Sequence, residues 1–191
     1  MKLSVCLVAG RRPDLLEKTL ESFSHKLFNH CDVDQVRVNL DPIFGSEDDQ
    51  QQCERILRAA FQSVEINTPM KPGFAKAVQW LWQDAPDGLV LHLEDDWICN
   101  EVIDIELVAE WMKTDVRSIQ LLSATHGKKG LNEYSESRHR NRCFGLRLGR
   151  RQIIPSFGTS PGFFLGDFLR KLAPLLNLEL DPEKQMKPEI N

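Results

Sequence analysis

Short aliphatic runs alternate with segments of helical periodicity through the first half of this chain. The runs that we expect to form strands are Leu3–Val8, Val36–Leu40, Val64–Ile66 and Leu89–Leu93. The helices that we expect between them cover about Pro13–Leu27, the segment after Gly45–Asp49, and Phe74–Trp82. Because this alternation is the pattern of βαβ units, the sequence predicts an α/β fold with a mostly parallel central sheet.

The second half of the chain has less regular periodicity. We expect a helix at about Val102–Met112, a strand at Ile119–Leu122, and a last helix near Asp167–Leu176. Thr125–Arg142 is polar and has no clear periodicity, so we interpret it as a long, mobile loop. Ile153–Leu165 should form short strands interrupted by prolines and glycines. At 191 residues, the chain is expected to form one domain over residues 1–191.

Composition excludes several classes of protein. No apolar run approaches the roughly 20 residues of a membrane span. The apolar run Leu3–Gly10 is too short for a signal core, and Arg11-Arg12 follows it instead of a cleavage site. The five cysteines are odd in number and scattered, without a C-x-x-C pair, which favours reduced thiols. We therefore expect a cytoplasmic protein.

Residues that could contact a ligand follow three of the expected strands, at the point where each strand ends. They are Gly10-Arg11-Arg12, Asp41 and the acidic run Glu94-Asp95-Asp96. Ligands of open α/β sheets bind beyond the carboxyl ends of the strands, so these residues should meet in one crevice. Adjacent carboxylates repel one another, and a hard divalent cation such as Mg²⁺ or Mn²⁺ that also bridges a diphosphate would stabilise them. The alternative is a solvated acidic loop that caps the next helix.

Four segments together resemble the GT-A glycosyltransferases, and specifically their family-2-like members. They are the strand, Arg-Pro turn and helix of Ser4–Phe23, the acid Asp41, the glycine-led helix start Gly73–Ala77, and Glu94–Asp96 in place of the D-x-D motif. The resemblance implies a GT-A-like three-layer α/β/α sandwich. It also divides the chain into a nucleotide-sugar-binding half, residues 1–97, and an acceptor half, residues 98–191.

The resemblance also implies site residues. Glu94 and Asp96 would hold the metal, and Asp95 would reach the ribose or the sugar. Arg12 and Asp41 would line the base pocket. The other residues expected along the nucleotide sugar are Ala9, Arg11 and Lys76. The Lys76 side chain has two interpretations, since it either faces solvent or reaches a phosphate.

The acceptor half carries the expected base. Ser160–Phe164, a helix, and then Asp181–Gln185 are similar to the acceptor side of the family, where an acid serves as base in inverting members. We assign this role to Glu183, with Asp181 as the alternative, although Glu183 could equally be the first-turn acid of a short helix. The chain has no Q-x-x-R-W motif, so processive polymer synthesis is not expected.

A basic segment lies between these parts. Arg138–Arg151 is rich in arginine, although the whole chain has a net charge of −4, unlike typical nucleic-acid binders. This segment is either a solvated surface or a contact for a diphosphate or an acidic acceptor. The net charge therefore disfavours nucleic acid as a partner, although the basic segment does not exclude it.

The sequence and the resemblance together predict a metal-dependent glycosyltransferase. It would move a sugar from a nucleotide-diphospho sugar, with UDP the expected nucleotide, to an acceptor hydroxyl with inversion. One alternative is a nucleotidyltransferase, which normally has a glycine- and lysine-rich loop after its first strand; Gly10–Pro13 is too short for one. The other alternative is a non-catalytic module that binds a sugar nucleotide or a glycan.

Overall fold

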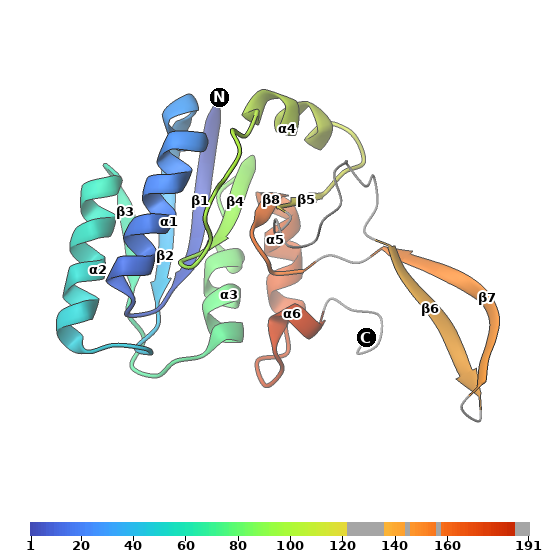
Figure 1. The fold of residues 1–191 in the computed structure, drawn as a ribbon. Helices are drawn as coiled ribbons and strands as arrows, with labels where there is room; N and C mark the ends of the chain where they lie inside the picture. The colour runs from blue at the N-terminus through green and yellow to red at the C-terminus, as the bar shows by residue number, and fades with distance from the viewer. Residues whose placement is uncertain (122–135, 144–145, 156–157, 186–191) are drawn as a thin grey trace.

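A six-stranded sheet forms the centre of the computed structural model, which describes residues 1–121, 136–143, 146–155 and 158–185 (Figure 1). The strand order is β3-β2-β1-β4-β8-β5. The strands are β1 (Lys2–Ala9), β2 (Asp32–Leu40), β3 (Val64–Asn67), β4 (Leu89–Glu94), β5 (Ser118–Gln120) and β8 (Gly162–Leu165). Strands β1 to β4 are parallel to one another, whereas β8 runs antiparallel to β4 and β5. The prediction of a mostly parallel sheet is confirmed.

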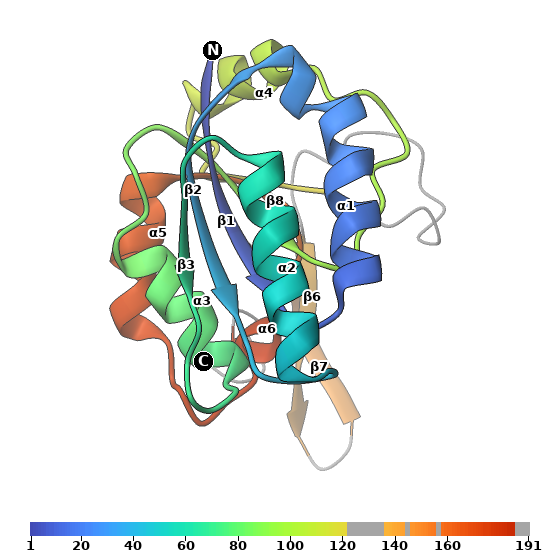
Figure 2. The ribbon, with the colours of Figure 1, turned by 90° about the vertical axis from the view of Figure 1, so that its left-hand side faces the viewer.

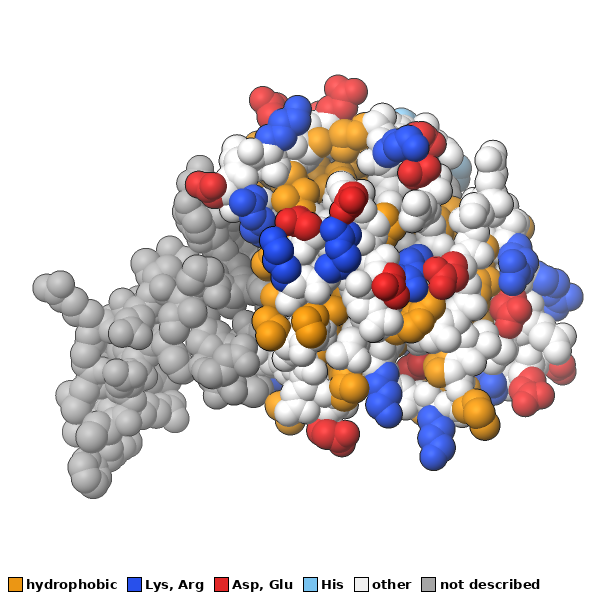
Figure 3. Space-filling model, turned by 180° about the vertical axis from the view of Figure 1, so that it is seen from behind, with side chains coloured by type: hydrophobic (Ala, Val, Ile, Leu, Met, Phe, Trp, Pro, Cys, Tyr) orange, Lys and Arg blue, Asp and Glu red, His pale blue; other side chains and the backbone are white. Residues whose placement is uncertain are grey.

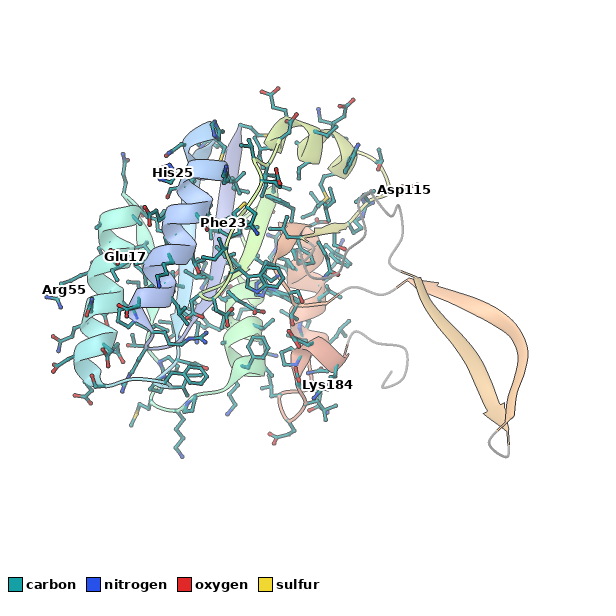
Figure 4. All side chains as sticks on the ribbon, viewed as in Figure 1. Glu17, Phe23, His25, Arg55, Asp115 and Lys184 are labelled. Atoms are coloured by element: carbon teal, nitrogen blue, oxygen red, sulfur yellow. The ribbon has the colours of Figure 1, made fainter. Side chains whose placement is uncertain are left out.

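Helices cover both faces of the sheet and make the three layers (Figures 1 and 2). One face carries α1 (Pro13–Lys26) and α2 (Glu47–Ala60), and the other carries α3 (Phe74–Gln83) and α5 (Gly166–Leu172). On α1, Phe23 packs toward the sheet, whereas Glu17 and His25 are exposed (Figure 4). This amphipathic pattern is what the helical periodicity of the sequence predicted.

Strand β1 is buried on both sides, which explains why its sequence after Lys2 is apolar apart from Ser4. Its residues Leu3, Val5 and Leu7 pack with α1 and α2, whereas Cys6 and Val8 pack with α3 and α5. Two hydrophobic cores, one on each face of the sheet, therefore hold the strands in place. Strand register then aligns the strand ends, because Ala9 of β1 pairs with Leu40 of β2 and Val8 pairs with Glu94 of β4.

Local signals set several helix starts. Pro13 occupies the first turn of α1, and Ser46 begins α2 with a capping box, in which its hydroxyl accepts from the N–H of Asp49 at 3.2 Å. Helix α4 (Ile105–Met112) begins later than Val102 because the Asp104 carboxylate accepts from the N–H groups of the next turn. The last helix of the prediction is α5 followed by the short 3-10 helix η3 (Ala173–Leu175).

Part of the segment expected to be a loop is a β-hairpin. Strands β6 (Glu136–Cys143) and β7 (Leu146–Pro155) pair antiparallel, to the side of the six-stranded sheet (Figure 1). The loop interpretation of Thr125–Arg142 was therefore wrong for residues 136–142, while residues 125–135 lie outside the described residues. A two-stranded hairpin is stabilised by backbone hydrogen bonds, so its sequence need not show the apolar alternation of a sheet with a buried face.

The remaining described elements are short. The 3-10 helix η1 (Phe28–His30) follows α1, and α6 (Pro182–Gln185) comes after η3. Among the described helices, none is both long enough and apolar enough to cross a membrane.

Candidate active site

A cleft of about 500 Å³ opens at the carboxyl ends of β1, β2 and β4. Its walls come from the β1–α1 turn, the β2–α2 turn, the start of α3, the residues after β4, and α6. The lining residues are Val8, Ala9, Gly10, Arg12, Asp41, Ile43, Phe44, Pro72, Gly73, Phe74, Glu94, Asp95, Asp96, Asp181 and Glu183. The expectation that the strand ends converge on one crevice is confirmed.

The middle acid of the triplet, Asp95, is held by protein groups. The residue is only 1% exposed, and its carboxylate accepts from the backbone N–H of Gly10 at 2.8 Å and from two nitrogens of the Arg12 guanidinium. Its backbone carbonyl accepts from the Thr19 hydroxyl at 2.8 Å. Burial raises the pKa of Asp95, and the bonds from Arg12 and Gly10 act in the opposite direction. Asp95 therefore ties the β1–α1 turn to the end of β4.

Glu94, the last residue of β4, has a different environment. Its Oε1 is buried and has no hydrogen-bond partner among the described residues. Burial raises the pKa of Glu94 to about 7, and the charges of Asp96 and Glu183 add to this shift. A buried carboxylate oxygen without a donor is destabilising unless something positive reaches it, because desolvation disfavours the charge.

The third acid, Asp96, is exposed at the mouth of the cleft. Its one ion pair among the described residues is with Arg12, whose Nη2 lies 3.4 Å from its Oδ2. The Arg12 guanidinium thus bridges Asp95 and Asp96, and it also lies over the ring of Phe44, 4.7 Å from the ring centroid. The three consecutive acids therefore differ in burial, partners and freedom to meet a ligand.

Asp41 joins two elements on the other side of the cleft. Its backbone N–H donates to the carbonyl of Ala9 at 2.8 Å, and its carboxylate accepts from Asn39 Nδ2 at 2.8 Å and from the N–H of Gly73 at 3.0 Å. Asn39 in turn accepts from Asn67 Nδ2 at 2.7 Å. This chain of bonds fixes the glycine that begins α3 against the end of β2.

The two acids expected near the acceptor both line the cleft, Asp181 from the residue before α6 and Glu183 from its first turn. Asp181 is engaged with this helix, since its carboxylate accepts from the N–H of Glu183 at 3.0 Å and pairs with Lys184 Nζ at 3.2 Å (Lys184 is labelled in Figure 4). The Glu183 side chain makes no hydrogen bond or ion pair with the described residues. Glu183 is both a first-turn residue of α6 and a residue of the cleft, so its two interpretations stay open.

Two of the expected residues lie outside this cleft. Arg11 points to α2, where its Nε and Nη2 donate to Gln50 Oε1 at 3.1 and 2.8 Å. Lys76 is exposed and lines a neighbouring groove of about 380 Å³ between the start of α3 and residues 178–182. Ala9, Arg12, Asp41, Glu94, Asp95, Asp96, Asp181 and Glu183 are the expected residues that the fold brings together.

Sequence reasoning missed three features in or directly behind the cleft. They are the Gly10 N–H that binds Asp95, the amide of Asn39 beside Asp41, and the aromatic ring of Phe44. Asn39 had a usable signal, because it is a polar residue inside the apolar run Val36–Leu40. Phe44 had one too, as a large apolar residue in a turn between a strand and a helix.

The charge of the cleft is strongly negative. Six carboxylates line it, from Asp41, Glu94, Asp95, Asp96, Asp181 and Glu183, and Arg12 is the cation of the described lining. On the face of the molecule seen from behind, by contrast, acidic and basic side chains are interspersed (Figure 3). An anionic ligand would therefore need a counter-charge to enter this cleft.

The donor set fits a cation that keeps some of its own ligands. Among the described residues, no three His, Cys, Asp or Glu side chains are arranged as a ready-made metal cage. Mg²⁺ typically binds through one or two carboxylates together with waters and substrate phosphates, and needs no such cage. Glu94, with its unpartnered oxygen, and the exposed Asp96 meet this requirement.

Comparisons with known proteins find similar folds but no related sequence family. No family model matches the sequence, and no curated protein matches it. Residues 1–349 of S. aureus TarS share the fold with a TM-score of 0.56 at 16% identity, over 100% of this chain and 53% of that one. The chain thus spans about half the length of this TarS structure.

Two nucleotide-dependent enzymes also share the fold. A CMP:2-keto-3-deoxy-manno-octonic acid synthetase complexed with CTP matches with a TM-score of 0.55 at 13% identity, over 99% of this chain and 83% of that one. A cytidylyltransferase from Leptospira borgpetersenii matches with a TM-score of 0.52 at 14% identity, over 96% and 68%. At such identities the likeness concerns the fold alone, and the GT-A-like sandwich predicted from the sequence is confirmed.

Proposed function

We propose that this protein is a glycosyltransferase that moves a sugar from a nucleotide-diphospho sugar, with UDP as the nucleotide, to an acceptor hydroxyl. The observation that carries the proposal is the cleft at the strand ends, where six carboxylates and one guanidinium surround a space of about 500 Å³. An acidic cleft of this kind suits a diphosphate that arrives with a divalent cation. Residues 1–97 would hold the donor, and residues 98–191 would receive the acceptor.

Glu94 and Asp96 are the residues proposed to hold Mn²⁺ or Mg²⁺. The support is the unpartnered Oε1 of Glu94 and the exposure of Asp96 in the same cleft. When bound, the cation would supply positive charge to the leaving diphosphate. Asp95 is proposed to act mainly by positioning, because its carboxylate is bound to Gly10 and Arg12. This refines the expectation that Asp95 reaches the ribose or the sugar.

The donor would lie along the ends of β1 and β2. Ala9, Arg12 and Asp41 line this side of the cleft, and a carboxylate such as Asp41 can accept from the N–H edge of uracil. Arg11 and Lys76 lie farther out, on Gln50 and in the neighbouring groove. We propose that Arg11 and Lys76 contact only those parts of the nucleotide sugar that extend beyond the cleft.

Glu183 is proposed to be the base that accepts the proton of the acceptor hydroxyl. The hydroxyl oxygen would attack the anomeric carbon, the bond from that carbon to the diphosphate oxygen would break, and the Glu183 carboxylate would take the hydroxyl proton. In-line attack of this kind inverts the anomeric carbon. The support is that the Glu183 carboxylate lines the cleft without a partner among the residues that the structure describes, whereas Asp181 is engaged with Lys184.

The nucleotidyltransferase alternative is disfavoured by the connection after β1. Strand β1 ends at Ala9 and α1 begins at Pro13, so Gly10-Arg11-Arg12 is the whole connection. A loop of this length leaves little backbone to surround a triphosphate. The shared fold of the cytidylyltransferases keeps CTP as the ligand to test beside UDP.

The proposal is tested by calorimetry and by product analysis. UDP should bind in Mn²⁺ and bind at least tenfold more weakly in EDTA, and CTP should bind more weakly than UDP under both conditions. A panel of UDP-sugars with acceptor sugars should then yield a glycosylated product. Binding of UDP that is equal in EDTA and Mn²⁺ would remove the metal from the proposal, and binding without any transfer would favour the non-catalytic module.

A pair of variants tests the base. Glu183→Gln should lower kcat by roughly 10²–10⁴ and leave the Kd for UDP unchanged, because a positioned base acts in the chemical step. Asp181→Asn, directly before the same helix, is the matched comparison. Collapse of kcat in Asp181→Asn with normal turnover in Glu183→Gln would move the role to Asp181, and full activity in both would place the base elsewhere.

A further inference from the structure

We propose that Phe44 is the stacking platform for the nucleobase of the donor. This inference rests on the proposed function, since it requires a nucleotide in the cleft. Phe44 belongs to the β2–α2 turn, lines the cleft, and is 70% exposed. A ring of this size gains little from exposure to water, so its place on the wall of a polar cleft calls for a ligand that covers it.

The backbone of Phe44 is unusual and firmly held. Its φ is 68°, and among the described residues no other residue apart from glycine has a positive φ. Residues with bulky side chains rarely adopt this region, and those that do concentrate at functional sites. Its neighbour Ile43 explains how the conformation persists, because the Ile43 N–H donates to Asp41 O at 2.8 Å and its carbonyl accepts from Arg11 N–H at 2.9 Å.

The residue after Phe44 adds a second restraint. A Cβ on Gly45 would lie 2.2 Å from the Arg11 carbonyl oxygen, so the chain approaches the β1–α1 turn as closely as a glycine permits. The turn on each side of Phe44 is thus fixed to the same neighbouring turn. The backbone that carries the ring is therefore held in place before any ligand arrives, which lowers the entropy cost of binding on the ring.

The ring also rests on defined partners. A Cβ on Gly10 would lie 2.9 Å from Phe44 Cδ2, so the absence of a side chain at Gly10 makes room for the ring. The Arg12 guanidinium lies 4.7 Å from the ring centroid, and Arg12 is itself held by Asp95. The ring is therefore supported by the β1–α1 turn, while most of its surface stays exposed.

The position of the ring favours a base over a sugar. Strand β2, which leads to Phe44, and strand β8, which leads toward α6, lie on opposite sides of the β1–β4 pair. The transferred sugar must lie near the proposed base Glu183 on α6, so the other end of the donor falls on the β2 side. Asp41 lies three residues before Phe44 and lines the same cleft. Its carboxylate could accept a hydrogen bond from an N–H group of the nucleobase.

The test compares ligands with and without a base. In Mn²⁺, Phe44→Ala should weaken binding of UDP and of a UDP-sugar by the same factor, roughly 5- to 150-fold, which is the usual range for base–aromatic stacking. Inorganic pyrophosphate, which has no base, should bind Phe44→Ala and the wild type equally. Phe44→Tyr should bind UDP like the wild type, because it keeps the aromatic face.

Leu175→Ala is the matched control, since Leu175 is 76% exposed and lies outside the cleft. It should leave every Kd unchanged, and both alanine variants should unfold at the wild-type temperature. Equal UDP binding by Phe44→Ala and the wild type would overturn the inference, as would a loss confined to the UDP-sugar, which would indicate stacking on the sugar. A wild type that binds no nucleotide would overturn the proposed function itself.

Discussion

Replacing Asp95 should damage the fold, whereas replacing its neighbour Asp96 should damage only ligand binding. The Asp95 carboxylate is buried and accepts from Gly10 N–H and from the Arg12 guanidinium. Asp96 is exposed, and its one ion pair within the described part of the chain is with Arg12 at 3.4 Å. Adjacent residues of the same chemical type therefore give a direct comparison of a structural and a functional carboxylate.

The magnitude follows from the groups that lose their partner. In Asp95→Ala, the Gly10 N–H loses a charge-assisted acceptor, which costs about 1–3 kcal/mol. Arg12 loses its buried partner but keeps 26% side-chain exposure, so water recovers part of that loss and about 1–2 kcal/mol remains. The expected total is about 3 kcal/mol, against less than about 1 kcal/mol for Asp96→Ala. For a chain of this size, about 3 kcal/mol lowers Tm by roughly 6–12 °C.

Urea unfolding followed by circular dichroism, without metal or nucleotide, measures both variants against the wild type. Asp95→Asn serves as an intermediate variant, because it keeps an acceptor oxygen for Gly10 and loses the charge that Arg12 needs. It should fall between the wild type and Asp95→Ala. Equal unfolding midpoints for Asp95→Ala and Asp96→Ala would refute the assignment of Asp95 to the fold.

Two further predictions concern pH and a buried tryptophan. The folded-state pKa of Glu94, about 7, lies above its ordinary value, so the folded state holds this proton more tightly and stability falls as pH rises from about 4.5 to 7. Urea titrations across this range should show the wild type losing about 2 kcal/mol relative to Glu94→Gln, and parallel curves would contradict the shift. Trp82 Nε1 donates to His92 Nδ1 at 3.2 Å, so Trp82→Phe should lower the free energy of unfolding by about 1–3 kcal/mol. The control Trp80→Phe changes a half-buried residue of the same helix and should lower it less. Equal unfolding midpoints of the two variants would count against the contribution of the bond.

The parallel part of the fold was predictable because burial on both faces of a strand produces a sequence signal. β1 and β4 are mostly apolar, interrupted inside the strands only by Ser4 and His92, and the helices between strands show helical periodicity. Strand β6 gave no such signal, because its sequence is almost entirely polar and its pairing with β7 rests on backbone bonds. Residue pattern alone therefore predicted a loop over residues 136–142, where strand β6 forms.

The site was predictable as a location but only partly as a set of contacts. Parallel strands end at one edge, so the meeting of Asp41 with Glu94–Asp96 followed from topology. Which of two adjacent arginines enters the cleft did not, since Arg11 and Arg12 differ only in the direction that the turn gives them. The structural role of Asp95, which sets it apart from Glu94 and Asp96, likewise depends on distances between β1 and β4. A residue pattern does not contain these distances.

The bridge that Arg12 makes between Asp95 and Asp96 has a consequence for how ligands enter. In the ligand-free protein, the guanidinium already serves as the counter-ion of Asp96. A divalent cation that binds Asp96 would therefore replace an internal cation, and binding becomes an exchange of ions. Because Asp95 retains Arg12 at the edge of the cleft, the displaced charge stays beside the incoming diphosphate. Such an exchange would make the affinity for the cation and the affinity for the diphosphate depend on each other, with Arg12 as the shared element.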